Sequence, residues 1–128
     1  MSERFEEQRE QFERALARLC DALAQPESDI VRDAIIQRFE FTFEMAWRCL
    51  FRYLSERGEK VAKKAWAVLP VAFQSLLIED AELWDTVREY RNATSHTYDE
   101  AKAIDVAAFV RDTAIGAFMT LQSKLRTL

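Results

Sequence analysis

Apolar side chains recur at helical spacing along the first part of the chain, over about residues 3–24. They fall on one stripe of the expected helix, and the charged residues fall on the opposite face. The stripe contains Phe5, Phe12, Leu16, Leu19 and Leu23, and the opposite face contains Glu6, Glu7, Glu10, Glu13 and Arg14. Pro26 then breaks the pattern, and Ser28 with Asp29 suits the start of a second helix. The pattern predicts an amphipathic helix, a short loop and a capped second helix.

The second expected helix is long, from about residue 29 to residue 57, with Gly58 as its stop. Its stretch FEFTFE alternates like a strand, but the flanks continue at helical spacing and favour a helix. One apolar stripe contains Ile36, Phe39, Phe43, Trp47, Leu50 and Leu54, and a second contains Val31, Ala34, Phe41, Met45 and Cys49. A helix that is apolar on two faces is central in a bundle or packs against another subunit. We therefore expect part of the second stripe to lie in a dimer interface.

The rest of the chain is also helical in pattern. Residues 61–78 are interrupted at Pro70, which predicts a kink or a break between two short helices. Another helix is expected from about position 80 through position 90, and the last from position 99 or 100 to the C-terminus. This last helix carries Val106, Val110, Ala114, Phe118, Leu121 and Leu125. We expect an all-α fold in which residues 1–128 form a single domain, an up-and-down bundle of four main helices with an additional short helix.

Charge and composition limit the possible functions. The formal net charge of −4 argues against non-specific binding of polyanions, but a local basic cleft remains possible. Lys60, Lys63 and Lys64 form the main lysine cluster, which we interpret as a solvated helix face. Cys20 and Cys49 form no CxxC pair and are expected to be free thiols in a reducing cytosol. We find no signal-peptide pattern and no run of membrane-spanning length, and expect a soluble cytoplasmic protein with no membrane contact.

The stretch YRNATSHTYDE, residues 90–100, contains the single histidine of the chain. On an ideal helix Arg91 and His96 would lie about 140° apart, on different faces. The residues between and beside them compete for backbone hydrogen bonds and predict that the helix ends here. These residues are Asn92, Thr94, Ser95 and Thr97. A tightened last turn could then bring Arg91, His96 and Tyr98 towards one polar concavity.

These three groups suit RNA cleavage by the neighbouring 2′-hydroxyl. Arginine binds phosphate through two parallel hydrogen bonds. Histidine accepts or donates a proton near neutral pH, and tyrosine offers a hydroxyl and an aromatic face for stacking. The sequence shows no zinc ligand set, so a metal-independent reaction without a cofactor is expected. A single histidine lacks either the acid or the base, and a symmetric dimer would supply the second copy. Capping and salt-bridge roles for Arg91 and His96 are the structural alternative.

The segment RNATSHTY resembles the RX4HXY motif of HEPN domains, with Arg91, His96 and Tyr98 on the motif positions. The stretches RFEFTFEMAWRCL and LLIEDAELWDTVREYRN resemble one branch of these domains, the nucleotidyltransferase substrate-binding family, which is related to HepT toxins. The likeness covers nearly the whole chain. It implies a HEPN four-helix bundle that dimerises, with two Arg–His motifs facing one cleft. Leu76 stands where this branch has a small residue, a departure that bears on helix packing.

The resemblance also implies a function, that of an RNase toxin held in check by a separate minimal nucleotidyltransferase. Arg91 would bind the scissile phosphate, Asn92 would orient it, and His96 would be the general acid or base. Tyr98 would accept AMP from the partner, and the added charge would compete with RNA for the cleft. Glu40 and Glu44, together with Arg88, could line the cleft or contact the partner; pairing of the two glutamates with arginine is equally compatible with the sequence. Lys102 could add positive charge.

Two other functions remain open from the sequence. In the first, the chain is a non-catalytic subunit whose cleft holds a nucleotide or another substrate for the nucleotidyltransferase. Arg91 would then clamp an anion and His96 would donate a hydrogen bond. In the second, the chain is a helical adaptor and the motif is structural. Binding and cleaving a phosphodiester require the same residue types, so the sequence does not separate these functions.

Overall fold

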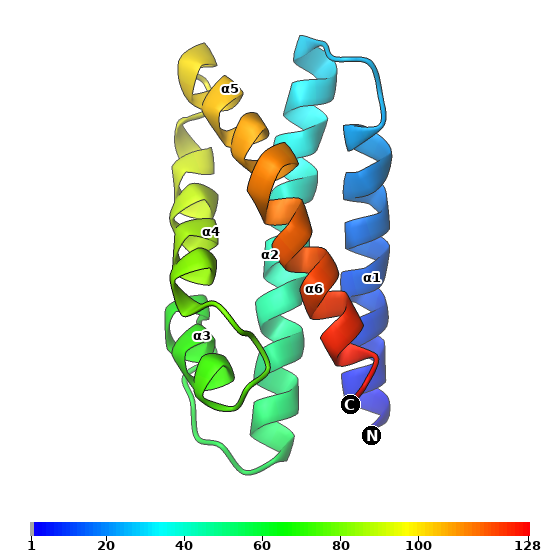
Figure 1. Cartoon of the computed structure of the whole chain (residues 1–128), viewed down its shortest axis with the longest axis vertical. Coiled ribbons are helices and arrows are strands. Elements are labelled where there is room, and N and C mark those ends of the chain that lie inside the picture. The colour runs from blue at the N-terminus through cyan, green and yellow to red at the C-terminus, as the bar shows by residue number, and fades with distance from the viewer. Residues whose placement is uncertain (1) are drawn as a thin grey trace.

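The computed structural model describes residues 2–128; Met1, the first residue of the expected domain, lies outside the described residues. The chain runs up α1, down α2, up through α3 and α4, and down through α5 and α6 (Figure 1). The helices are α1 (Glu3–Leu23), α2 (Asp29–Glu56), α3 (Ala65–Gln74), α4 (Ala81–Ala93), α5 (Glu100–Phe109) and α6 (Ile115–Leu125). Both ends of the chain lie at the same end of the bundle (Figure 1). The predicted all-α bundle with one additional short helix is confirmed.

The second helix, α2, begins and ends with the expected capping residues. The Ser28 hydroxyl accepts a hydrogen bond from the Val31 backbone N–H at 3.1 Å, which satisfies a donor that the first turn leaves unpaired. At the other end of α2, Gly58 adopts φ +88°, and the N–H of Glu59 bonds to the Leu54 carbonyl at 3.0 Å. This is a Schellman cap, in which a left-handed residue favours glycine. The predicted stop at Gly58 is thus confirmed.

Pro70 lies inside α3 and does not divide the segment into two helices, so the expected break is wrong. Residues 61–64 and 75–80 are not helical, and a single helix of ten residues lies between them. Proline removes the bond to the carbonyl four residues earlier, which is that of Trp66. That carbonyl belongs to the exposed first turn, and burial of Val68, Leu69 and Ala72 holds the helix together.

Leu76 ends α3 in the same way that Gly58 ends α2. It adopts φ +62°, and the next residue, Leu77, donates its N–H to the Ala72 carbonyl at 2.9 Å. Leu76 is 75% exposed, whereas Leu77 and Ile78 are buried. The departure at this position therefore falls mainly on the backbone, because the side chain of Leu76 is largely exposed.

The last helical segment is continuous but contains a π-helical turn, Val110–Ala114, between α5 and α6. Arg111 in this turn donates from Nη1 to the Leu23 carbonyl at 3.0 Å and so caps the end of α1. The apolar side of the segment faces the interior through Val110, Ala114 and Phe118. No helix in residues 2–128 is both long and apolar enough to cross a membrane.

The interior is made by the stripes that the sequence predicts. The buried members are Phe5, Phe12, Leu16 and Leu19 of α1, Ile36, Phe39, Phe43, Trp47, Leu50 and Leu54 of α2, and Phe118, Leu121 and Leu125 of α6. Cys49, assigned above to the second stripe of α2, is fully buried, and burial raises the pKa of its thiol to about 12. Both Cys20 and Cys49 are free, as expected.

Candidate functional site

The end of α4 is built by side-chain hydroxyls. Thr94 Oγ1 lies 2.7 Å from the Arg91 carbonyl, Ser95 Oγ donates to the Asn92 carbonyl at 3.1 Å, and Thr97 Oγ1 donates to the Thr94 carbonyl at 3.0 Å. These contacts satisfy carbonyls that the helix end leaves without partners. The chain therefore leaves α4 after Ala93 and tightens into a 3₁₀ turn, Thr94–His96. This confirms the prediction that the polar run ends the helix.

Arg91 is held by a contact from the neighbouring helix α2. Its Nη1 lies 3.2 Å from Glu40 Oε2 and donates to Thr94 Oγ1 at 3.0 Å. The Thr94 hydroxyl is also 2.9 Å from the same Glu40 oxygen, although its one proton can serve either Glu40 or the Arg91 carbonyl at a time. Both charged side chains are about 30% exposed, at 29% and 31%. Glu40 thus fixes the guanidinium through Nη1, and no hydrogen bond from the described residues reaches Nη2.

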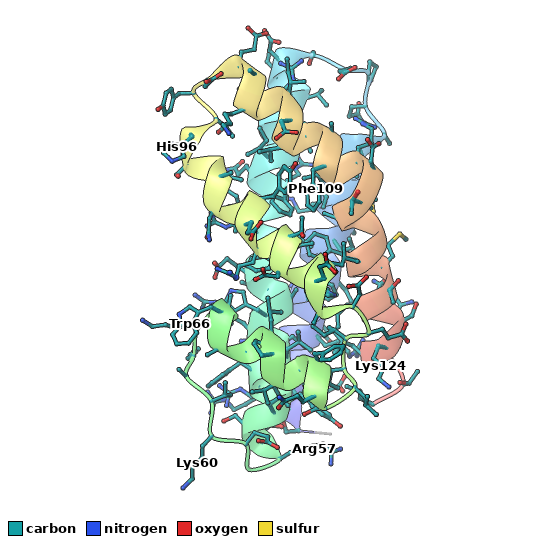
Figure 2. All side chains as sticks on the ribbon, turned by 60° about the vertical axis from the view of Figure 1, so that its left-hand side comes forward. Arg57, Lys60, Trp66, His96, Phe109 and Lys124 are labelled. Atoms are coloured by element: carbon teal, nitrogen blue, oxygen red, sulfur yellow. The ribbon has the colours of Figure 1, made fainter. Side chains whose placement is uncertain are left out.

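His96 and Tyr98 lie on the outside of the corner that follows α4. Their rings meet edge to face with centroids 6.2 Å apart, and Tyr98 is 88% exposed. His96 is also exposed and projects from the edge of the molecule in Figure 2. No hydrogen bond among residues 2–128 joins the imidazole to the Arg91 guanidinium. The turn has tightened as expected, but Arg91 and His96 still face different surroundings in one copy of the chain.

A groove of about 370 Å³ lies beside the motif. Arg88, Arg91 and Asn92 of α4 form one wall, and Glu44 contributes from α2. The other wall contains Lys63, Lys64 and Trp66. Arg88 is paired with Asp85 at 2.9 Å and Glu44 with Arg48 at 3.4 Å, on their own helices. Among the charged lining residues cations outnumber carboxylates four to one, and His96 and Tyr98 lie outside the lining.

The lysine cluster is exposed to solvent, as expected, but it lies in a loop and not on a helix face. Lys63 and Lys64 belong to the loop before α3, and both line the groove, whereas Lys60 is exposed outside the lining. The apolar pattern predicted a helix over the surrounding segment, and it indicated no role for Trp66. The stretch KKAW, which places two cations beside an exposed aromatic residue, was the available signal.

Tyr90, which is partly buried, connects the end of α4 to α5. Its ring stacks on Phe109 of α5 with centroids 3.9 Å apart and planes 2° from parallel. Its hydroxyl donates to Asp105 Oδ1 at 3.4 Å. Burial raises the pKa of Tyr90, and the Asp105 carboxylate raises it further. Tyr90 stays neutral in this environment and joins α4 to α5 just before the motif.

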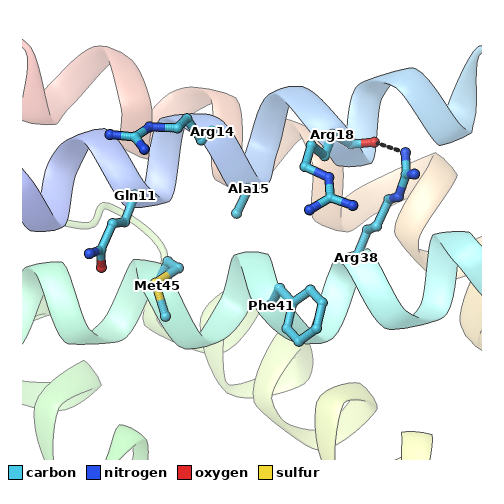
Figure 3. Close-up of a pocket in the computed structure, with 7 residues that line it drawn as sticks. All are labelled: Gln11, Arg14, Ala15, Arg18, Arg38, Phe41 and Met45. Atoms are coloured by element: carbon cyan, nitrogen blue, oxygen red, sulfur yellow. Dashed lines mark hydrogen bonds between the residues drawn. The ribbon is translucent and has the colours of Figure 1, made fainter.

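A second hollow, of about 330 Å³, lies between the outer faces of α1 and α2 (Figure 3). Phe41, which is 50% exposed, and Met45 face it from α2. Arg14, Arg18 and Arg38 surround this apolar centre, and Arg38 donates to the Arg18 carbonyl at 2.7 Å. The hollow contains part of the second stripe of α2 but none of the motif residues. Residues 2–128 hold no group of three or more metal-ligating side chains in this hollow or elsewhere.

Known proteins resemble this chain in sequence and in fold. It is 33% identical to a probable ribonuclease HepT from Haemophilus influenzae over 101 residues, which cover 73% of this chain and 69% of the relative. A crystal structure from Thermus thermophilus matches with a TM-score of 0.75 and 32% identity, covering 91% of this chain and 96% of that one. A Haemophilus influenzae structure described as the fold of a substrate-binding domain of a nucleotidyltransferase matches with a TM-score of 0.70 and 28% identity, covering 95% and 96%.

The family model described as nucleotidyltransferase substrate binding protein like matches residues 7–127. This span contains α2 with Glu40, the groove and the whole RX4HXY motif. The resemblance inferred from the sequence is thereby confirmed at the level of the family. This chain belongs to the nucleotidyltransferase substrate-binding-like family.

Proposed function

We propose that this chain is a HEPN-type, metal-independent endoribonuclease toxin that acts in the cytoplasm and is controlled by a cognate minimal nucleotidyltransferase. The observation that carries the proposal is the arrangement of Arg91, which Glu40 and Thr94 hold from one side at the edge of a cationic groove. A relative named probable ribonuclease HepT supports the choice of reaction. Arg91, Asn92 and His96 are the proposed catalytic residues.

The proposed reaction is attack of an RNA 2′-hydroxyl on the adjacent phosphorus. The O2′–P bond forms, the P–O5′ bond breaks, and the products are a 2′,3′-cyclic phosphate and a 5′-hydroxyl. One group takes the proton from O2′, and another gives a proton to O5′. Arg91 stabilises the added charge on the phosphorane through Nη2, which Glu40 does not engage, and Asn92 orients the phosphate. No metal or cofactor takes part.

A homodimer completes this site. One copy holds a single histidine, whereas the reaction needs an acid and a base. A second copy supplies the other His96 across a shared cleft. The half-exposed stripe of α2 around Phe41 is the surface that we assign to the dimer contact, because Phe41 is a large apolar side chain with half of its surface in water.

The partner acts on Tyr98. At 88% exposure, this hydroxyl is open to a second enzyme. In the proposed reaction the Tyr98 oxygen attacks the α-phosphorus of ATP bound by the partner, pyrophosphate leaves, and the phenolic proton passes to a base. The product carries a negative phosphodiester and an adenosine beside His96, and both oppose RNA binding. Arg88, Glu44 and Lys102 are candidate contacts at the rim of the cleft or with the partner.

The first test expresses wild type, His96→Ala and Arg91→Ala without a partner. We expect growth arrest and RNA decay with wild type only, and a fall of about 100-fold or more in cleavage by each purified variant. Light scattering on the same proteins should give twice the 15.0 kDa chain mass. Cleavage is followed in the presence of a metal chelator.

The matched control is Arg4→Ala, which removes an exposed arginine outside the groove. It should cleave like wild type. Equal cleavage by His96→Ala and wild type would show that the site is wrongly assigned. A monomer mass at micromolar concentration would contradict the shared cleft.

The second test concerns Tyr98. Co-expression with the cognate minimal nucleotidyltransferase should add the mass of one AMP to wild type and none to Tyr98→Phe. The modified wild type should lose RNA cleavage, whereas Tyr98→Phe should escape inhibition. Modification of Tyr98→Phe at another residue would contradict the assigned acceptor.

A second candidate function is a non-catalytic subunit that holds a nucleotide for the nucleotidyltransferase. The family description and the groove lined by Arg88, Arg91 and two lysines favour it. Under this function neither wild type nor His96→Ala would arrest growth. Nucleotide binding in the presence of the partner would then depend on Arg91.

A further inference from the structure

The groove beside the motif carries more positive charge than the motif itself supplies. Arg88 and Arg91 come from α4, and Lys63 and Lys64 come from the loop before α3. Glu44 is the one carboxylate among the described lining residues, and it is already paired on its own helix. Four cations therefore line one hollow of a chain whose formal net charge is −4. Such a local concentration of charge attracts a polyanion that the protein as a whole would repel.

Two of these cations are held in place by weak contacts. The Lys63 ammonium lies over the Phe51 ring, 5.7 Å from its centroid. Arg88 is paired with Asp85, whose side chain is 58% exposed. Exposed ion pairs and cation–π contacts contribute little to stability, so a phosphate can replace them without a large penalty. The contacts nevertheless keep both cations beside the groove before a ligand arrives.

Trp66 adds an aromatic face to the same wall. It is 61% exposed, whereas Trp47 and Trp84 are 7% and 3% exposed. It lines the groove on one side and a smaller hollow of about 90 Å³ on the other, and Arg88 lines both. Figure 2 shows Trp66 and His96 projecting along the same edge of the molecule. An exposed indole beside several cations is the arrangement with which proteins bind unpaired bases and their phosphates.

The order of these residues along the chain indicates the path that a bound strand would take. Arg88 and Arg91 are one helical turn apart, and His96 is the last residue of the 3₁₀ turn. At helical rise the path from Arg88 to His96 is about 12 Å. A strand that begins at Trp66 and follows the groove therefore passes Arg88 before it reaches Arg91. A duplex does not fit this arrangement, because its bases are already stacked and paired.

We infer that Trp66, Lys63 and Lys64 form a docking element for single-stranded RNA, which holds nucleotides next to the bond to be cleaved. Trp66 stacks on one unpaired base, and the two lysines contact phosphates of the same strand. Arg88 binds the phosphate between this element and Arg91. The inference rests on the proposed ribonuclease function, because it extends the strand whose scissile phosphate Arg91 binds.

The test measures binding without cleavage, in the His96→Ala protein, with a short fluorescent single-stranded RNA. Adding Trp66→Ala should weaken binding about 5- to 150-fold, the range for loss of one stacked base. Adding Lys63→Ala and Lys64→Ala together should lower the slope of log affinity against log salt by about 1.4, for two phosphate contacts. The intrinsic fluorescence of Trp66 should be quenched by the RNA, and Trp66→Phe should remove the quenching.

Two matched controls lie close by but outside the groove. Lys60→Ala removes a lysine from the same loop, and Phe73→Ala removes a 41% exposed aromatic residue from the same helix. Both should bind RNA within about twofold of the parent. Far-UV circular dichroism checks that each variant is folded.

The docking element is overturned if Trp66→Ala and the double lysine variant bind single-stranded RNA as the controls do. It is also overturned if duplex RNA binds as tightly as a single strand with no change in Trp66 fluorescence. Failure of the proposed ribonuclease function would give a different result. Wild type would not cleave RNA, but the Trp66 and lysine substitutions would still weaken RNA binding. The element would in that case stand as a binding surface without a nuclease.

Discussion

The interior around Phe118 and the corner at the end of α4 both hold several helices together, but through different contacts. Phe118 of α6 is fully buried. Its ring lies 6.3 Å from Phe12 of α1, 6.1 Å from Phe39 of α2 and 5.8 Å from Trp84 of α4, measured between centroids. One side chain thus joins four helices through tilted and edge-on aromatic contacts, which add to the gain from burial.

At the corner, polar contacts replace the rings. Glu40 reaches from α2 to Arg91, the hydroxyl of Thr94 lies between them, and the side chains that follow are exposed. Such a half-exposed ion pair contributes little net stability, because desolvation offsets most of the attraction. Its effect is to hold Arg91 in one orientation through Nη1, while Nη2 makes no hydrogen bond to the described residues.

We therefore expect the interior to determine stability and the corner to determine the proposed function. The interior needs apolar volume and tolerates little change in it, whereas the corner needs particular polar groups and contributes little to folding. Substitutions in the two regions should therefore give opposite phenotypes.

Phe118→Ala tests whether the interior determines stability, and it should have the largest effect on folding. Loss of the ring leaves a cavity among four helices and should lower the free energy of unfolding by about 3–5 kcal/mol. Urea unfolding followed by circular dichroism measures the change. Below its melting temperature the variant should retain RNA cleavage, because no motif residue touches the Phe118 ring among the described contacts.

His96→Ala is the counterpart in the same assays. The imidazole is exposed, and its loss should change the unfolding free energy by less than about 0.5 kcal/mol while cleavage is lost. A destabilised His96→Ala, or a folded Phe118→Ala without cleavage, would show that the two regions are coupled.

The sequence predicts the interior well because burial follows the apolar period. Every member of the first stripe of α2, from Ile36 to Leu54, is buried. Pro70 misled the prediction, since the lost hydrogen bond falls in the exposed first turn of α3 and tertiary packing outweighs it. The long second stripe was also only partly correct, because Cys49 is fully buried while Phe41 remains half exposed.

The candidate site is predictable only in part. The polar run after Arg91 correctly places the end of α4, because those side chains bond to local carbonyls. The contact of Glu40 with Arg91 depends on how α2 packs against α4, and sequence spacing contains no information on that. The position of Lys63 and Lys64 beside the motif was not predicted for a similar reason, since their loop reaches the motif only through the packing of α3 against α4.

The two left-handed helix caps also show that a residue can affect stability without affecting the proposed function. Gly58 and Leu76 occupy the same position in equivalent Schellman caps, with φ of +88° and +62°. Glycine adopts this conformation without steric strain, whereas leucine does not. Leu76 is nevertheless held there because Leu77 and Ile78, the next two residues, are buried in the interior. The packing of the interior therefore overrides the backbone preference of an exposed residue.

Leu76→Gly should raise the free energy of unfolding by about 0.5–1 kcal/mol, since relief of the left-handed strain exceeds the added freedom of the unfolded chain. Gly58→Ala should lower it by about 1 kcal/mol, and strain is the cause because an added Cβ meets no described atom within 4 Å. Urea unfolding of both variants measures these opposite shifts, and RNA cleavage should change in neither. A destabilised Leu76→Gly would mean that the exposed leucine makes a favourable contact, and the surface it covers would then belong to the packed region.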